Sequence, residues 1–277
     1  MYSRQLEQQG KPDPSKGDEI GLLDRGLQSP TQMSDLRFDL LRAVWVLISA
    51  RMVRLVLFDI DGTLIHTGGA GVKAFAKVFE TEFKAIDGFH GMKFAGRTDV
   101  SLVREFFQLH QIPASPENFE RFFERYAFWL AEMLHPGKTV LCPGVREFIR
   151  DLKALPEPPM LGLLTGNIRL GAEIKLRQAQ LWEEFETGGF ADDHELRDQI
   201  AVAARDRGSR LLGKNLSGDE VVVVGDTPHD IRCGRAIGAK VLAVATGGSA
   251  YPELESHQPD WMVRDLRDIR AEEVAGR

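Results

Sequence analysis

The stretch LVLFDIDGTLI, residues 55–65, decides the fold of this chain. Its apolar half extends back to Val53 and predicts a strand buried on both faces, as in a parallel sheet. The apolar run ends abruptly at two acidic residues, Asp59 and Asp61. Because side chains repeat every second residue along an extended chain, both carboxylates point to one side. Such a pair suits a nucleophile beside a group that donates and accepts protons.

Beyond this stretch, apolar strand runs alternate with amphipathic helical segments. Strands are predicted at 53–58, 160–164, 221–224 and 241–245, with a weaker one near 185–190, and helices at 144–155, 169–179, 195–207 and 230–237. This alternation predicts an α/β fold, a Rossmann-like three-layer core with a mostly parallel sheet. In such folds ligands bind beyond the carboxyl ends of the strands, so the residues that follow each strand are the candidates for chemistry.

Two further strand ends bring polar residues to that edge. One strand runs into Thr165-Gly166-Asn167, and another runs into a segment that contains Asp226 and Asp230. A lone aspartate at a strand end commonly caps a helix, and Asp230 could be such an N-cap. Two carboxylates 4 Å apart repel by roughly 4 kcal/mol at an effective dielectric constant near 20, so four of them need a compensating cation or some of them must be protonated. Hard oxygen ligands beside a phosphate favour Mg²⁺.

One segment interrupts the alternation. Roughly 70 residues separate the first strand from the turn at Pro143, far more than the usual connection of about 2–6 residues. The segment predicts helices at 72–83, 99–110 and 116–134. We therefore expect a helical cap domain at 68–142 that acts as a lid, inserted into an α/β core hydrolase domain at 52–67 and 143–277. Residues 1–51, rich in polar residues, Gly and Pro, are expected to form a disordered or loosely packed N-terminal extension, with a short helix over 33–51.

Composition and charge exclude several classes of protein. The 277 residues are 43% hydrophobic and carry a formal net charge of -6, which argues against a nucleic-acid partner. No stretch approaches the roughly 20 apolar residues that a membrane span needs, so no membrane segment is predicted. The two cysteines, Cys142 and Cys233, form no metal-ligand spacing and are interpreted as reduced thiols of a cytoplasmic protein.

Three motifs in order resemble a known family. LVLFDIDGTLI, LLTGN and VVVVGDTPHD each follow a predicted strand, and together they resemble the haloacid dehalogenase-like phosphatases over Val53 to about Leu266. The long insertion resembles the helical cap of that family. Its stretches GGAG (68–71) and AGRTD (95–99) are similar to those of phosphoglycolate-phosphatase-like members.

The resemblance implies a role for each acidic residue. Asp59 would attack phosphorus to give a phosphoaspartyl enzyme, and Asp61 would protonate the leaving alkoxide and then activate water. Mg²⁺ would bind the Asp59 carboxylate, the Asp61 backbone carbonyl and Asp226, with Asp230 close by. Members that act on carbon–halogen bonds lack the second aspartate, so the resemblance implies phosphatase rather than dehalogenase chemistry.

The same resemblance implies a phosphate site at Thr165, Gly166 and Asn167. The family also places a lysine beside the nucleophile, but the corresponding stretch, residues 191–208, contains none. Arg197 is interpreted as its substitute, since arginine binds phosphate oxygens in bidentate fashion, and a solvated helical arginine is the alternative. Arg97 could contact the far end of the substrate or form a salt bridge within the cap.

These observations predict a Mg²⁺-dependent phosphatase acting on a small phosphorylated metabolite such as phosphoglycolate, as a monomer or homodimer. A phosphomutase of a sugar phosphate would use the same aspartates, and the sequence does not separate the two. Cleavage of a phosphonate would need a Schiff-base lysine in the cap, and no lysine there has a persuasive context. A non-catalytic binding protein on the same fold is the fourth alternative, and the intact acidic cluster argues against it.

Overall fold

The computed structural model describes residues 52–85, 92–134 and 137–276. All of them belong to one compact unit, Leu47–Arg277. The N-terminal extension predicted at 1–51, and its helix, lie outside the described residues.

A six-stranded sheet forms the centre of this unit, and each of its strand pairings is parallel. The strand order is β5-β4-β1-β6-β7-β8. The strands are β1 (Leu55–Phe58), β4 (Met160–Leu164), β5 (Thr187–Gly189), β6 (Val221–Gly225), β7 (Lys240–Val244) and β8 (Trp261–Val263). This confirms the predicted α/β fold with a parallel sheet.

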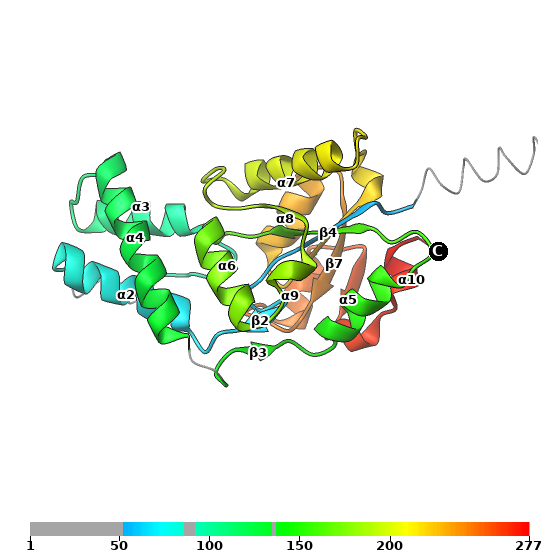
Figure 1. The fold of residues 1–277 in the computed structure, drawn as a ribbon, viewed down its shortest axis with the longest axis horizontal. Coiled ribbons are helices and arrows are strands. Elements are labelled where there is room, and N and C mark those ends of the chain that lie inside the picture. Colours follow the sequence, from blue (N-terminus) through cyan, green and yellow to red (C-terminus); the bar gives the residue numbers. More distant parts are fainter. Residues whose placement is uncertain (1–51, 86–91, 135–136, 277) are drawn as a thin grey trace, which may run out of the picture. The chain divides into compact units, whose positions relative to one another are not determined.

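Helices cover both faces of the sheet. They are α5 (Val145–Lys153), α6 (Arg169–Gln178), α7 (Arg197–Leu211), α8 (Pro228–Ala236), α9 (Tyr251–Ser256) and α10 (Ala271–Val274). Val56 and Phe58 of β1 pack into the apolar cluster that includes α5, α6 and α10, whereas Leu55 and Leu57 pack into the one that includes α7 and α8. The period-two alternation of a strand thus produces the three layers, which Figure 1 shows around β4 and β7.

Three helices lie between β2 (Ile65–His66) and β3 (Val140–Leu141), which pair as a small antiparallel sheet. They are α2 (Ala70–Phe83), α3 (Asp99–Leu109) and α4 (Pro116–Met133), and we call them the helical insert. The insert has an aromatic core of its own, in which the rings of Phe79 and Phe106 stack with centroids 3.5 Å apart. Its designation as a cap domain stays a prediction. None of the described helices is long and apolar enough to span a membrane.

Candidate active site

Three strands deliver the polar residues to one edge of the sheet. Phe58, the last residue of β1, is in register with Leu163 of β4 and Val224 of β6. Consequently Asp59, Thr165 and Asp226, which follow those strands closely, come together although more than 160 residues separate the first from the last. The sequence motifs thus converge at the predicted edge.

Three of the four aspartates form a compact buried cluster. Asp59, Asp226 and Asp230 each offer a carboxylate oxygen, and these oxygens lie within 4.8 Å of one another. Asp226 is fixed at both oxygens, because the Thr63 hydroxyl donates to Oδ1 at 3.0 Å and the Gly248 backbone N–H donates to Oδ2 at 3.0 Å. All three oxygens are hard donors, so the cluster fits a hard divalent cation.

The turn after β1 needs glycine at position 62. Gly62 has a φ of +89°, a left-handed conformation that side chains rarely adopt. A Cβ there would lie 2.6 Å from Oδ2 of Asp226 and 2.8 Å from Cα of Gly247. The small residue therefore lets the β1 turn pack directly against the carboxylate that follows β6.

Asp230 is held inside the first turn of α8. Thr227, rather than Asp230, is the N-cap, and Asp230 accepts from the backbone N–H of Thr227 at 3.0 Å and from its hydroxyl at 2.7 Å. The reason for the shift is Pro228, which occupies the first helical position, where a missing N–H costs nothing. This capping box orients the other oxygen of Asp230 toward the cluster.

Arg197 neutralises part of the cluster from the first turn of α7. Its Nη2 lies 2.8 Å from Oδ1 of Asp59 and 2.5 Å from Oδ1 of Asp230. The side chain is 4% exposed, so it is not a solvated helical arginine. Its Nη1 donates to the backbone carbonyl of Gly96, at 3.3 Å, whereas its Nε is buried and has no hydrogen-bond partner among the described residues.

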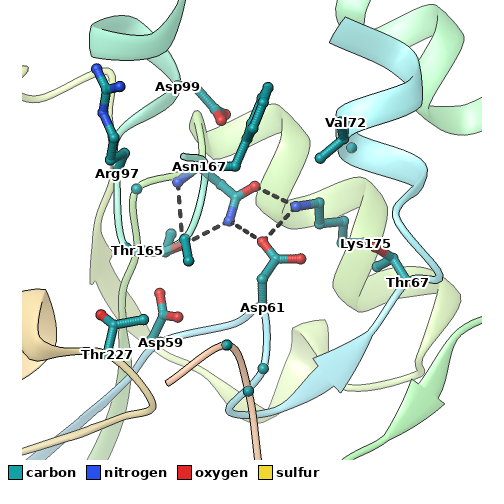
Figure 2. Close-up of a pocket in the computed structure, with 18 of the residues that line it drawn as sticks. Asp59, Asp61, Thr67, Val72, Arg97, Asp99, Thr165, Asn167, Lys175 and Thr227 are labelled. Atoms are coloured by element: carbon teal, nitrogen blue, oxygen red, sulfur yellow. Dashed lines mark hydrogen bonds and ion pairs between the residues drawn. The ribbon is translucent and has the colours of Figure 1, made fainter. Parts of the chain in front are cut away.

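Asp61 belongs to a second network, which Figure 2 shows beside Asp59. The Asn167 amide nitrogen donates to Oδ2 of Asp61 at 2.9 Å and to the Thr165 hydroxyl at 2.8 Å. The Asn167 amide oxygen accepts from Nζ of Lys175 at 2.6 Å, and the same Nζ lies 2.6 Å from Oδ2 of Asp61. The amide of Asn167 is thereby used at both ends, which fixes its orientation.

Lys175 is the residue that sequence reasoning missed. It lies on α6 and is 4% exposed. The signal was present, because Lys175 occupies the apolar stripe of α6 together with Gly171, Ala172 and Leu176. A lysine on the buried face of a helix needs a partner, and the acidic edge of the sheet supplies it.

Burial and neighbouring charges set the protonation of the site. Burial raises the pKa of Asp59 to about 7, against the opposing charge of Arg197. Burial likewise raises the pKa of Asp226, and two neighbouring carboxylates add to the effect. Enclosure would also raise the pKa of Asp61, but Lys175 and the Asn167 amide hold it below its usual range. The cluster around Asp59 therefore holds less positive than negative charge when its carboxylates are ionised, whereas Asp61 is already compensated.

A cavity of about 450 Å³ opens in front of these residues. Both Asp59 and Asp61 line it, as do Thr165, Arg197 and part of the helical insert. Arg97 also lines the cavity, but its guanidinium is bound to Glu105 of α3 and, in Figure 2, is directed away from Asp59 and Asp61. Its predicted contact with substrate therefore stays a prediction.

The chain belongs to the haloacid dehalogenase-like hydrolase family, whose model matches residues 56–244, well over half of its length. This is the class of protein that the parallel sheet and the aspartates at its edge define.

Relatives of known name resemble the chain at low identity. A bifunctional riboflavin kinase/FMN phosphatase from Arabidopsis thaliana is 26% identical over 220 residues, which make up 78% of this chain and 54% of that protein, so the chain spans about half its length. The pyrophosphatase PpaX of Bacillus cereus is 26% identical over 231 residues, with 94% of it covered. Among solved structures, a predicted phosphoglycolate phosphatase from Haemophilus somnus superposes with a TM-score of 0.61 at 18% identity, covering 78% of this chain and 96% of that one, a likeness of fold.

Proposed function

We propose that this chain is a Mg²⁺-dependent phosphatase that hydrolyses a small phosphorylated metabolite through a phosphoaspartyl intermediate at Asp59. The observation that carries the proposal is that two separate groups of side chains, one around Asp59 and one around Asp61, lie side by side at one wall of the cavity. Asp59 lies in the acidic cluster with Asp226 and Asp230, and Asp61 lies in a separate hydrogen-bonded network beside it. The relatives named phosphatases and pyrophosphatases support hydrolysis of a phosphate ester or anhydride.

In the first step, an oxygen of Asp59 attacks phosphorus, and the bond from phosphorus to the leaving oxygen breaks. The leaving alkoxide takes a proton from Asp61, which lines the same cavity. The Thr165 hydroxyl accepts from the backbone N–H and the amide nitrogen of Asn167, at 3.2 and 2.8 Å, so its own proton is available to a phosphoryl oxygen. Arg197 fixes the attacking carboxylate and takes the place of the family's lysine.

In the second step, water attacks the phosphoaspartate. Asp61, now a carboxylate, accepts the proton of the attacking water, and the bond between phosphorus and Asp59 breaks to release inorganic phosphate. Lys175 and Asn167 favour this carboxylate form and hold it in one place. The enzyme returns to its starting protonation state after one turnover.

The cluster of Asp59, Asp226 and Asp230 would hold Mg²⁺, with the Asp61 backbone carbonyl as a further ligand. When bound, the ion supplies positive charge that orients the phosphoryl group and offsets its negative charge. The guanidinium of Arg197 pairs with Asp59 and Asp230, two of the three buried carboxylates, so the described residues leave a deficit of positive charge that fits such an ion.

The helical insert would act as the cap of this site. Its residues line the cavity together with the core, so closure would exclude water during phosphoryl transfer and limit the size of the substrate. We further propose that the enzyme works in the cytoplasm as a monomer or homodimer. Its two cysteines, Cys142 and Cys233, are buried and unpaired, which suits a reducing compartment.

Turnover of para-nitrophenyl phosphate tests the proposal. We expect phosphate release with Mg²⁺, loss of activity in EDTA, and a fall of at least about 10³-fold in Asp59→Asn, because the amide is a poor nucleophile. Asp219→Asn, an exposed aspartate remote from the cavity, is the matched control. Activity that survives EDTA or Asp59→Asn would contradict the mechanism, and an isomerised sugar phosphate in place of free phosphate would identify a mutase.

A further inference from the structure

The part of the cavity beyond the proposed phosphate site has a lining that is mostly apolar and carries a few polar side chains. The helical insert contributes an apolar wall that includes Phe75, Phe94 and Leu102. Two polar side chains stand within this wall, Asp99 at the start of α3 and Tyr126 on α4. This region would receive whatever alcohol the phosphate is attached to.

Each arginine and lysine lining the cavity, among the residues that the structure describes, already has a carboxylate partner. Arg97 is paired with Glu105, Lys175 with Asp61, and Arg197 with Asp59 and Asp230. The charge of each is therefore balanced before a substrate enters. Apart from His66, an exposed side chain that also lines the cavity, a substrate carboxylate would find no uncompensated cationic side chain among these residues and would face the carboxylate of Asp99.

Side chains with unused hydrogen-bonding atoms, in contrast, are available there. Asp99 uses Oδ2 to accept from the Ile168 backbone N–H at 2.8 Å, and its Oδ1 makes no hydrogen bond within the described part of the chain. Tyr126 is 1% exposed and its hydroxyl has no hydrogen-bond partner among those residues either. The hydroxyl lies near Lys175 and Gly71, since a Cβ built on Gly71 would be 3.6 Å from it and 3.5 Å from Nζ of Lys175.

From these contacts we infer the substrate class: a phosphate monoester whose alcohol carries further hydrogen-bond donors, hydroxyl or ammonium, and no carboxylate. The Asp99 carboxylate accepts from these donors, the Tyr126 hydroxyl can accept from or donate to the same groups, and the apolar wall contacts the carbon skeleton. The inference rests on the proposed phosphatase function and departs from phosphoglycolate, the example that the sequence favours. A buried polar group designed to pair with a donor discriminates strongly against a ligand that lacks it.

Three two-carbon esters of nearly equal size isolate this chemistry. They are 2-hydroxyethyl phosphate, O-phosphoethanolamine and 2-phosphoglycolate, which differ only in a terminal hydroxyl, ammonium or carboxylate. We expect kcat/KM for at least one of the first two to exceed that for phosphoglycolate by about 10-fold or more. Comparing the hydroxyl and the ammonium ester shows which donor the site prefers. Para-nitrophenyl phosphate, measured in parallel, reports the phosphatase activity itself.

Two substitutions test the assigned residues. Asp99→Asn keeps an oxygen for the Ile168 N–H but removes the charge, and should reduce the preference for the favoured ester over phosphoglycolate by about 10-fold. Tyr126→Phe keeps the buried ring and should lower kcat/KM for the favoured ester about 3-fold to 10-fold. It should lower kcat/KM for para-nitrophenyl phosphate less. Asp219→Asn and Tyr251→Phe, both outside the cavity, are the matched controls.

The outcomes separate the inference from the function on which it rests. If para-nitrophenyl phosphate is hydrolysed but phosphoglycolate is preferred, or the three esters are equivalent or inert, the substrate class is wrong and the phosphatase stands. If para-nitrophenyl phosphate and the esters all fail, both proposals fall. A donor preference that Asp99→Asn and Tyr126→Phe leave unchanged would overturn the assignment of these two residues.

Discussion

Lys175 shows how much one side chain organises at this site. Its ammonium group joins the proposed acid/base, Asp61, to the amide that orients Thr165, through two contacts of 2.6 Å. A buried ammonium with two polar partners restricts both of them to one rotamer. Because the ammonium group of Lys175 is already bound to Asp61 and to the Asn167 amide oxygen, it acts on the chemistry through these two residues rather than by attacking or protonating the substrate.

Replacing Lys175 by methionine should therefore damage catalysis more than folding. We expect kcat to fall about 10-fold to 100-fold, since Asp61 and Asn167 lose the group that positions them. The pKa of Asp61 should also rise toward its ordinary value, because Lys175 is the main group that lowers it. The acidic limb of the pH–rate profile for para-nitrophenyl phosphate should then move to higher pH.

Lys153→Met is the matched control for this substitution. Lys153 pairs with Glu184 at the surface, with 45% of its side chain exposed, so its loss should leave both the rate and the profile unchanged. A Lys175→Met enzyme with reduced activity but an unshifted profile would show that the residue supports the fold alone.

Which site residues can be predicted from sequence follows from how each is placed. Asp59, Thr165 and Asp226 come directly after strands, and the carboxyl ends of parallel strands meet at one edge, so sequence order suffices. The partners of Lys175 and Arg97 depend instead on how α6 and α3 pack. That information is tertiary, and the spacing of apolar residues indicates only that Lys175 lies on a buried face.

At the scale of elements, the loop before α3 fastens the helical insert to the core. The Asp99 backbone N–H donates to the Gly166 carbonyl at 2.7 Å, and the Thr98 hydroxyl donates to the carbonyl of Glu195 at 2.8 Å. Arg104 of α3 adds a salt bridge to Glu195 at 2.8 Å. The AGRTD stretch, which resembles that of phosphoglycolate phosphatases, thus holds the insert against Gly166 in the loop after β4 and against Glu195 before α7.

Gly166→Ala should disturb this docking. A Cβ at Gly166 would lie 2.1 Å from the backbone oxygen of Arg97, so the loop before α3 must move away. We expect kcat/KM for para-nitrophenyl phosphate to fall by about 10² or more, because a displacement of about 1 Å at a catalytic site costs that much. Gly218→Ala creates a comparable clash, 2.3 Å from the Gly238 oxygen, far from the cavity.

The comparison of these two variants separates docking from general instability. Gly218→Ala should lower the melting temperature while the folded enzyme keeps its specific activity. Gly166→Ala should lose activity at temperatures where it is still folded, as measured by circular dichroism. Equal loss of activity in both variants would refute the docking role.

The sequence predicts helices and strands well where the pattern of apolar residues extends over the whole element. The helix expected at 116–134 is observed at Pro116–Met133, with Ser115 as its N-cap, and the strand expected at 160–164 is observed unchanged. The strand β8 and the pair β2–β3 were not predicted. They contain two or three residues each, too few for an alternating pattern to emerge. The pairing of β8 depends on the sheet edge that β7 offers, and β2 and β3 pair with each other in a separate sheet.

At the scale of the whole molecule, the buried carboxylates couple stability to pH and to metal. Burial raises the pKa of Asp59 and of Asp99 to about 7 each, whereas both titrate near 4 in an unfolded chain. Between those values the folded state binds more protons than the unfolded state. Without metal, the free energy of unfolding that these groups contribute is therefore fully present below about pH 4 and is lost as the pH rises through about 7.

Magnesium should reverse this loss, and its effect should itself depend on pH. Protons and the ion compete for the cluster of Asp59, Asp226 and Asp230, so the ion binds more tightly at pH 8 than at pH 5.5. At a concentration 100 times its dissociation constant at pH 8, it stabilises the fold by about 2.7 kcal/mol, which corresponds to roughly 5–10 °C in melting temperature. Thermal melts in EDTA and in Mg²⁺ at both pH values measure the effect.

The substitution Asp226→Asn should remove most of this difference in melting temperature, whereas Asp219→Asn, at an exposed aspartate outside the cavity, should preserve it. A stabilisation that is equal at the two pH values, or larger at pH 5.5, would mean that the ion does not bind at these buried carboxylates.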